Sequence, residues 1–329
     1  MKELYPLLFE PVFKDYIWGG RNLEKFGRIL PNSGIVAESW EISSHEDGMT
    51  RVKNGKYAGL TLQAVLEDLR ELLVGKRNQW ALDRGKFPLL VKLLDANQPL
   101  SVQVHPNDDY ALLHEGNELG KTEMWVVLEA APDAAIIYGL SKQTDAETLR
   151  QALASGQFES FLNKVSIKKG DHICVPTGTL HTILGGAALA EIQQNSNTTY
   201  RVYDWNRLGT DGKPRPLHID KALDVINYDQ IACLLSVPDR ILSEDSYDVE
   251  RLCQNKYFST YRYQFSDEGH LTGECDGSTL EIWGVVSGSA TIAGYQLQPV
   301  NFILLPAGLG KYQIETDKDT SLLHVLTEG

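Results

Sequence analysis

Cysteine is scarce in this sequence. Four cysteines are spread over 329 residues, and no two of them form a C-x-x-C pair: Cys174, Cys233, Cys253 and Cys275. This spacing argues against a thiolate zinc site and against a disulfide framework. We therefore expect buried, reduced thiols, as is usual in cytosolic proteins.

Positive charge and long apolar stretches are also in short supply. Lys and Arg number 31 against 44 Asp and Glu, which leaves a formal net charge of −13. A broad basic surface for DNA or RNA is therefore not expected, although a small anionic ligand needs only a local positive cluster. The apolar runs are far shorter than a membrane span, and the first residues lack an apolar signal-peptide core. These absences predict a cytoplasmic protein without a nucleic-acid or membrane partner.

What the chain does contain is a succession of strand-length apolar runs. Gly, Pro, Asn and Asp separate them, which is the pattern of a mainly β sandwich or barrel. The expected strands are 87–96, 100–106, 124–130, 135–140, 172–176, 188–194 and 199–205. Helical spacing of apolar residues and a possible N-cap at Asp145 predict fewer helices, at 61–74, 107–119, 145–163 and 216–236.

A weak internal repeat divides the chain. The string E-M-W at 123–125 resembles E-I-W at 281–283, and V-P-T-G-T-L-H at 175–181 lines up with L-P-A-G-L-G-K at 305–311. One such match could be chance, but two in the same order favour two related β-units. The first copy is longer and holds the expected 145–163 helix. The second copy ends on lysine where the first ends on histidine.

Four polar residues in and beside the predicted strands could hold a metal. Gln103 and His105 are two residues apart in L-S-V-Q-V-H-P, so both side chains point to one side of a strand. They could face a barrel interior, or they could be the solvent face of a half-buried strand. Glu123 begins a strand and His181 follows a turn, and each is ordinary taken alone. Together the four offer two imidazoles and two oxygens, which suits zinc or another divalent metal in an open site.

The stretch 190–207 is the other candidate for chemistry. Glu191 lies in a predicted strand, and Arg201 and Arg207 stand close to hydroxyl-bearing residues. Arginine offers a planar fork of donors that suits a phosphate or sugar hydroxyls. The alternative is an ordinary salt bridge, for instance with Asp204 or Glu191.

These motifs together resemble the type I mannose-6-phosphate isomerase (phosphomannose isomerase) family, in its short bacterial form. The matching strings are W-G-G (18–20), E-S-W-E-I-S (38–43), L-L-V-K-L-L-D-A (89–96), Q-V-H-P-N-D (103–108), G-K-T-E-M-W (120–125), V-P-T-G-T-L-H (175–181) and E-I-Q-Q-N-S-N-T-T-Y-R-V-Y-D-W (191–205). The resemblance implies two cupin-type (jelly-roll) β-barrels with helical insertions. The first, metal-binding and catalytic, would span 1–235, and the second, degenerate, would span 236–329.

The resemblance also implies the chemistry. One zinc ion per chain would be bound by four side chains, with three more in the active site: Gln103, His105, Glu123 and His181 for the metal, then Arg201, Lys121 and Glu191. The implied reaction interconverts D-mannose 6-phosphate and D-fructose 6-phosphate by proton transfer through an enediol. The base could be Glu191 or Lys121, Arg207 could contact phosphate, and the chain could be a monomer or a homodimer. A cupin-type metal oxygenase or a non-catalytic sugar-phosphate-binding protein are the competing hypotheses.

Overall fold

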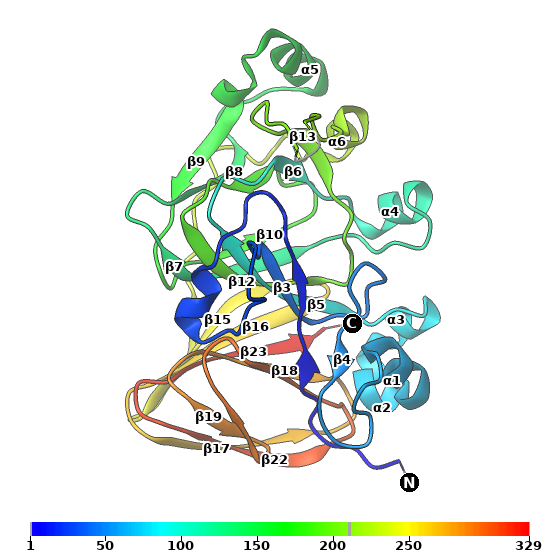
Figure 1. Cartoon of the computed structure of the whole chain (residues 1–329), viewed down its shortest axis with the longest axis vertical. Helices are drawn as coiled ribbons and strands as arrows, with labels where there is room; N and C mark the ends of the chain where they lie inside the picture. The colour runs from blue at the N-terminus through cyan, green and yellow to red at the C-terminus, as the bar shows by residue number, and fades with distance from the viewer. Residues whose placement is uncertain (1, 210–211, 329) are drawn as a thin grey trace.

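The computed structural model describes residues 2–209 and 212–328, and β-strands dominate it (Figure 1). The strands up to residue 203 are β1 (Phe9–Glu10), β2 (Val12–Lys14), β3 (Glu38–Ile42), β4 (Arg51–Val52), β5 (Leu89–Ala96), β6 (Val102–Val104), β7 (Glu123–Ala130), β8 (Ala135–Leu140), β9 (Leu162–Ser166), β10 (His172–Val175), β11 (His181–Ile183), β12 (Ala187–Gln194) and β13 (Tyr200–Tyr203). The later strands are β14 (Asp239–Ser243), β15 (Tyr247–Gln254), β16 (Phe258–Phe265), β17 (Gly269–Cys275), β18 (Glu281–Ser287), β19 (Ala290–Ile292), β20 (Tyr295–Leu297), β21 (Phe302–Leu305), β22 (Gly310–Thr316) and β23 (Ser321–Thr327). The mainly β prediction is therefore confirmed.

The helices of the described chain are short, and all of them lie before residue 226. They are α1 (Leu62–Leu69), α2 (Glu71–Val74), α3 (Gln79–Asp83), α4 (Asp108–His114), α5 (Ala146–Ser155) and α6 (Ile219–Val225), with 3-10 turns at Asn22–Phe26, Lys76–Asn78 and Phe158–Phe161. No helix in the described ranges is long and apolar enough to cross a membrane.

Most predicted elements are present, and their ends differ for local reasons. The 61–74 helix is interrupted at Arg70, where φ is +48°. Helix α5 begins at its predicted cap, because the Asp145 side chain accepts a hydrogen bond from the Thr148 amide. The 216–236 helix was predicted too long: after Val225 the Asn227 amide donates to the Gly178 carbonyl instead. Likewise, β13 stops at Tyr203, since positive φ values follow at Trp205 and Asn206.

The sheets form two sets in which corresponding strands follow the same order, except that β13 of the first set has no counterpart in the second. In the first set, a six-stranded sheet of order β10-β7-β12-β5-β3-β2 accompanies a five-stranded sheet of order β13-β6-β11-β8-β9. In the second set, a six-stranded sheet of order β14-β15-β16-β23-β18-β21 accompanies a four-stranded sheet of order β17-β22-β19-β20. Reading both along the chain, β3 corresponds to β15, β7 to β18, β11 to β22 and β12 to β23. This correspondence agrees with the internal repeat.

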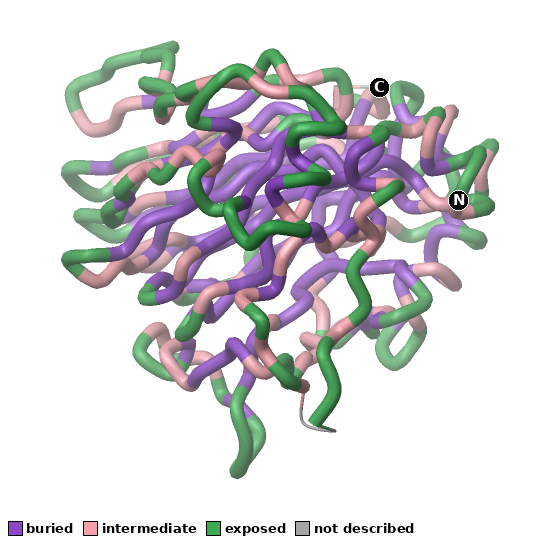
Figure 2. The backbone as a smooth tube through the Cα atoms, turned by 90° about the horizontal axis from the view of Figure 1, so that it is seen from above, coloured by how far each residue is buried: buried purple, intermediate pink, exposed green. Residues whose placement is uncertain are grey.

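Alternation along the strands directs one face of each six-stranded sheet to a shared core. Met124 and Val126 of β7 lie in one apolar cluster with Ile282 and Val325 of β18 and β23. The intervening Trp125 belongs to a separate cluster on the opposite face. Buried residues accordingly run through the middle of the molecule, whereas exposed ones lie mainly in peripheral loops (Figure 2). Glu123, two residues before Trp125, therefore points away from the shared core.

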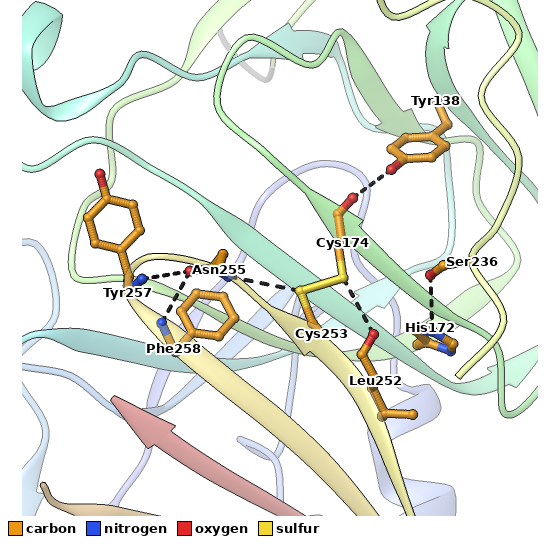
Figure 3. The surroundings of a disulfide bond; sticks show 9 residues. All are labelled: Tyr138, His172, Cys174, Ser236, Leu252, Cys253, Asn255, Tyr257 and Phe258. Atoms are coloured by element: carbon orange, nitrogen blue, oxygen red, sulfur yellow. Dashed lines mark hydrogen bonds between the residues drawn. A yellow bond between two sulfur atoms is a disulfide. The ribbon is translucent and has the colours of Figure 1, made fainter. Parts of the chain in front are cut away.

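The expectation that all cysteines are reduced was wrong for one pair. Cys174 of β10 and Cys253 of β15 form a disulfide that connects the two sheet sets (Figure 3). Cys233 and Cys275 are free. Sequence spacing did not reveal the pair, because the two cysteines are 79 residues apart and meet only where β10 lies against β15.

Candidate functional site

Three of the predicted metal ligands meet inside the first sheet set. Glu123 is the first residue of β7 and His181 the first of β11, while His105 follows the end of β6. Glu123 Oε1 lies 3.2 Å from His181 Nε2, and Glu123 Oε2 lies 3.4 Å from His105 Nε2. The ligand atoms of these three buried residues lie within 4.8 Å of one another. The fourth predicted ligand, Gln103, is beside them, with its side-chain amide 3.4 Å from His181 Nε2.

Backbone carbonyls orient both imidazole rings. His105 Nδ1 lies 2.9 Å from the Thr198 carbonyl, and His181 Nδ1 lies 2.8 Å from the Thr179 carbonyl. A carbonyl oxygen can only accept a hydrogen bond, so each Nδ1 carries the proton and donates it. Each Nε2 is then left with a lone pair toward Glu123. Burial, with the nearby Lys121 charge, lowers the pKa of His105 to about 3. His105 is therefore a neutral imidazole, which is the form that binds a metal.

Glu123 is the buried charge at the centre of this group. Its side chain is 0% exposed, and neither carboxylate oxygen has a hydrogen bond of good geometry in the part of the chain that the structure describes. Burial would raise its pKa, but the Lys121 ammonium and the contacts with His105 and His181 outweigh burial and hold the pKa well below the usual range. A buried carboxylate without hydrogen bonds is costly. The donor set, with the Glu123 carboxylate at its centre, fits a divalent metal.

Lys121 lies directly beside the cluster. Its ammonium is 2.7 Å from Glu123 Oε2 and 3.0 Å from His105 Nε2. The side chain is 5% exposed, so its charge acts in a region with little water. Lys121 can therefore either balance the Glu123 charge or turn toward a bound anion.

Glu191 of β12 is the second buried carboxylate. Trp125 Nε1 donates to Glu191 Oε1 at 3.1 Å, and Lys92 Nζ is 3.7 Å from Oε2. Burial and the negative charge of Glu123 raise the pKa of Glu191 to about 7. A carboxyl group with this pKa exchanges a proton readily at neutral pH, which is what general acid–base catalysis requires.

Arg201 of β13 lines the same cavity from the other sheet. Its Nε donates to Ser101 Oγ at 3.3 Å and its Nη1 to the Pro216 carbonyl at 2.9 Å. Burial, together with the charge of Arg215, lowers its pKa from the ordinary value. An arginine has so high a pKa that the guanidinium stays charged. It is thus a fixed cation on the cavity wall.

These side chains surround one cavity of about 260 Å³ between the two sheets of the first set. Its lining includes Gln103, Lys121, His181, Glu191 and Arg201, five of the predicted site residues. Arg207 does not line it: this side chain contacts Asp204 Oδ1 at 2.6 Å, the salt bridge that was the alternative for it. Arg215 lines the cavity instead and shares Asp204, at 2.5 Å.

Sequence reasoning missed three charged residues of the cavity, namely Lys92, Glu38 and Arg215. Lys92 was the detectable one, because it is the only polar residue before Asp95 in the fully buried strand β5. Burial favours its neutral amine, but the carboxylates of Glu38, at 3.6 Å, and Glu191 outweigh this effect and hold its pKa above the ordinary value. Arg215 carried no local signal, since a loop brings it to the cavity.

Comparison with known proteins gives one consistent answer. Residues 7–126 match the family model described as phosphomannose isomerase type I, catalytic domain. The chain is 40% identical over 326 residues to the probable mannose-6-phosphate isomerase GmuF of Bacillus subtilis, which covers 97% of this chain and 99% of that protein. It is 38% identical to mannose-6-phosphate isomerase ManA of the same organism, over 97% and 99% of the two chains.

Solved structures agree with these relatives. The crystal structure of mannose 6-phosphate isomerase from Bacillus subtilis superposes with a TM-score of 0.85 at 35% identity, over 97% of this chain and 99% of that one. A putative mannosephosphate isomerase from Archaeoglobus fulgidus has a TM-score of 0.76 over 100% of both chains, but at 19% identity it shares the fold alone.

Proposed function

This chain belongs to the type I mannose-6-phosphate isomerase family and is an isomerase, and we propose that it interconverts D-mannose 6-phosphate and D-fructose 6-phosphate. The observation that carries the proposal is the shared cavity of Gln103, Lys121, His181, Glu191 and Arg201. That cavity combines a candidate metal cluster, two proton-transfer groups and a cation beyond them.

We propose that one zinc ion per chain is held by Gln103, His105, Glu123 and His181. Two observations support this assignment: the buried Glu123 oxygens make no hydrogen bond of good geometry among the described residues, and both imidazoles are oriented by backbone carbonyls. When bound, zinc would act as a Lewis acid that orients and polarises the sugar oxygens at C1 and C2.

The isomerisation moves one proton from C2 to C1 and another between O1 and O2, through an enediol. Glu191 and Lys121 are the candidates for these transfers. Glu191 has the better-matched acidity, since its pKa is near 7. Lys121, an ion-paired neighbour of Glu123, can donate to a sugar oxygen that gains negative charge.

Arg201 supplies a preorganised positive charge for the negative charge that develops on the sugar oxygens when the enediol forms. Its hydrogen bonds to Ser101 and Pro216 fix its guanidinium before substrate arrives. Fixed donors aimed at developing charge lower the barrier without reorganising during the reaction. Arg215, on the same wall, is a further candidate for phosphate contact.

At the level of architecture, we propose that the two sheet sets are cupin-type barrels, with α5 as a helical insertion between β8 and β9. Residues 1–235 would form the metal-binding catalytic domain and 236–329 the degenerate one. The matching strand order of the two six-stranded sheets supports this division. A cytoplasmic location and a monomeric or homodimeric state also stay predictions.

The decisive test is a coupled assay for fructose 6-phosphate formed from mannose 6-phosphate. Purified protein should lose activity on exhaustive chelation and regain it with added zinc. Full turnover by the metal-free protein would contradict the metal assignment. Oxygen consumption with bound iron, or tight sugar-phosphate binding without turnover, would favour the oxygenase or the binding protein instead.

A further inference from the structure

The second sheet set contains a cavity of its own, of about 390 Å³. Its walls come from β14, β15, β16, β17, β18, β22 and β23, so it lies between the two sheets of that set. Several of these strands correspond to the strands that line the first cavity. The two cavities therefore occupy equivalent places in the two sets.

Strand pairing makes the equivalence specific. In the first set Trp125 pairs with Glu191, and in the second Trp283 pairs with His324. On the neighbouring strand, Glu191 pairs with Lys92 and His324 pairs with Tyr261. The residues two positions further on, Leu94 and Tyr263, line the first and the second cavity respectively. The second cavity thus keeps the location of the first but carries different chemistry.

The polar centre of the second cavity is Glu281. Its Oε2 accepts from Tyr312 at 2.6 Å and lies 2.7 Å from His324 Nε2, with Trp283 Nε1 at 3.3 Å. Among the described residues, its Oε1 accepts only from the Cys275 thiol, at 3.5 Å. A thiol is a weak donor, and Glu281 is only 7% exposed. One buried carboxylate oxygen is therefore left with spare capacity to accept a hydrogen bond.

Two tyrosine hydroxyls add to this capacity. Tyr247 and Tyr263 line the cavity, and neither hydroxyl makes a hydrogen bond to any residue within 2–209 or 212–328. Their rings and those of Trp283 and His324 contact one another, with Trp283 and His324 stacked at 3.9 Å. The ring faces are largely used in these contacts, which leaves hydroxyl and carboxylate groups as the main polar groups for a ligand.

The charge of the lining selects the class of ligand. It contains Glu274 and Glu281 but no lysine or arginine, so a phosphate would be repelled. A small neutral molecule with several hydroxyls would meet donors, acceptors and apolar ring edges together. We propose that the second sheet set binds a neutral sugar of about one hexose unit in this cavity, separately from the catalytic site.

The test is calorimetric titration of the full-length protein with D-mannose and D-glucose. The titration is repeated with a mixture of mannose 6-phosphate and fructose 6-phosphate in the cell, which keeps the first cavity filled. The mixture is brought to equilibrium beforehand so that isomerisation adds no heat. We expect saturable binding of one hexose that this mixture does not displace. The double variant Tyr247→Phe, Tyr263→Phe should weaken it by about tenfold or more, with isomerase activity unchanged. Tyr295→Phe, in β20 and outside the cavity, is the matched control and should bind normally.

Four results would overturn the proposal. These are no saturable binding at millimolar hexose, displacement by the sugar phosphates, unchanged affinity in the double variant, and tighter binding of tetramethylammonium than of either hexose. The last result would assign the cavity to cations, which aromatic rings beside a carboxylate also attract. If the double variant folds poorly, the single variant Tyr247→Phe, at a half-buried position, replaces it in the binding measurement.

Discussion

At the scale of single residues, the candidate site is made of charges that the core tolerates only because they face one another. Lys92, Lys121, Glu123 and Glu191 are all nearly inaccessible to water. Each would be costly alone, but they form two ion pairs, Lys121 with Glu123 at 2.7 Å and Lys92 with Glu191 at 3.7 Å. Removing one partner should therefore disturb the others more than a surface change would.

Arg201 is the proposed site residue whose substitution should separate catalysis from binding. We expect Arg201→Ala to lower kcat by about 10²- to 10³-fold, because a preorganised charge at the reacting oxygens is lost. KM should change much less, as judged from steady-state kinetics with mannose 6-phosphate. Arg207→Ala is the matched control, since Arg207 contacts Asp204 outside the cavity and should change kcat little. An effect of Arg201→Ala confined to KM would place this residue in substrate binding alone.

Glu118 should determine part of the acid sensitivity of the fold. Partial burial would raise its pKa, but His45 at 3.3 Å and Lys86 at 2.9 Å outweigh burial and lower it to about 2. A carboxylate with a depressed folded-state pKa stabilises the protein above its unfolded pKa of about 4.3 and loses that effect as the pH falls toward 2.

Urea unfolding between pH 7 and pH 2.5 measures this contribution. We expect Glu118→Gln to lower the free energy of unfolding at pH 7 by up to about 3 kcal/mol, with the difference from wild type shrinking below pH 4. Glu46→Gln, at an exposed position nearby, is the control and should follow the wild type. A difference that stays constant across the pH range would contradict this role.

At the scale of elements, the turn between β10 and β11 positions two of the candidate ligands. The Gly178 amide donates to the His105 carbonyl at 2.9 Å, and His181 begins β11 three residues later. The same glycine accepts from the Asn227 amide at 2.8 Å, which is the contact that ends α6 early. One turn therefore connects both histidines to the connector that follows the first sheet set.

Gly178→Ala tests this turn. Gly178 has a φ of +82°, and an added Cβ would lie 2.8 Å from the Val225 carbonyl oxygen. We expect a loss of about 1–3 kcal/mol of stability and a drop in zinc affinity, measured by chelator competition, because His105 and His181 shift. Gly156→Ala, also at positive φ but with nothing within 4 Å, should cost stability without changing zinc affinity. Equal effects of both variants on zinc affinity would refute the proposed link.

At the scale of the whole molecule, the two sheet sets are held together by a shared core and by one covalent bond. Apolar residues of β7 and β18 lie in a single cluster, and the Cys174–Cys253 disulfide joins β10 to β15 beside it. The disulfide closes a loop of 79 residues. It restricts the unfolded chain more than a short loop would.

Thiol titration of the unfolded protein tests the disulfide directly. Protein unfolded without reductant should expose two thiols, those of Cys233 and Cys275, and reductant should raise the number to four. Reduction should also lower the midpoint of thermal unfolding, by an amount that Cys174→Ser with Cys253→Ser reproduces. Four thiols without reductant would show that the pair is open in solution.

The sequence by itself determined the mainly β architecture, the repeat and most residues of the candidate site. Alternating apolar strands, the cap at Asp145 and the paired positions of Gln103 and His105 are local patterns, and local backbone geometry decides where such side chains point. Tertiary structure alone decided that Arg215 rather than Arg207 faces the cavity, that Lys92 and Glu38 complete it, and that Cys174 meets Cys253. Each of these contacts joins residues far apart in the chain, and only the packing of the strands and loops brings such groups together.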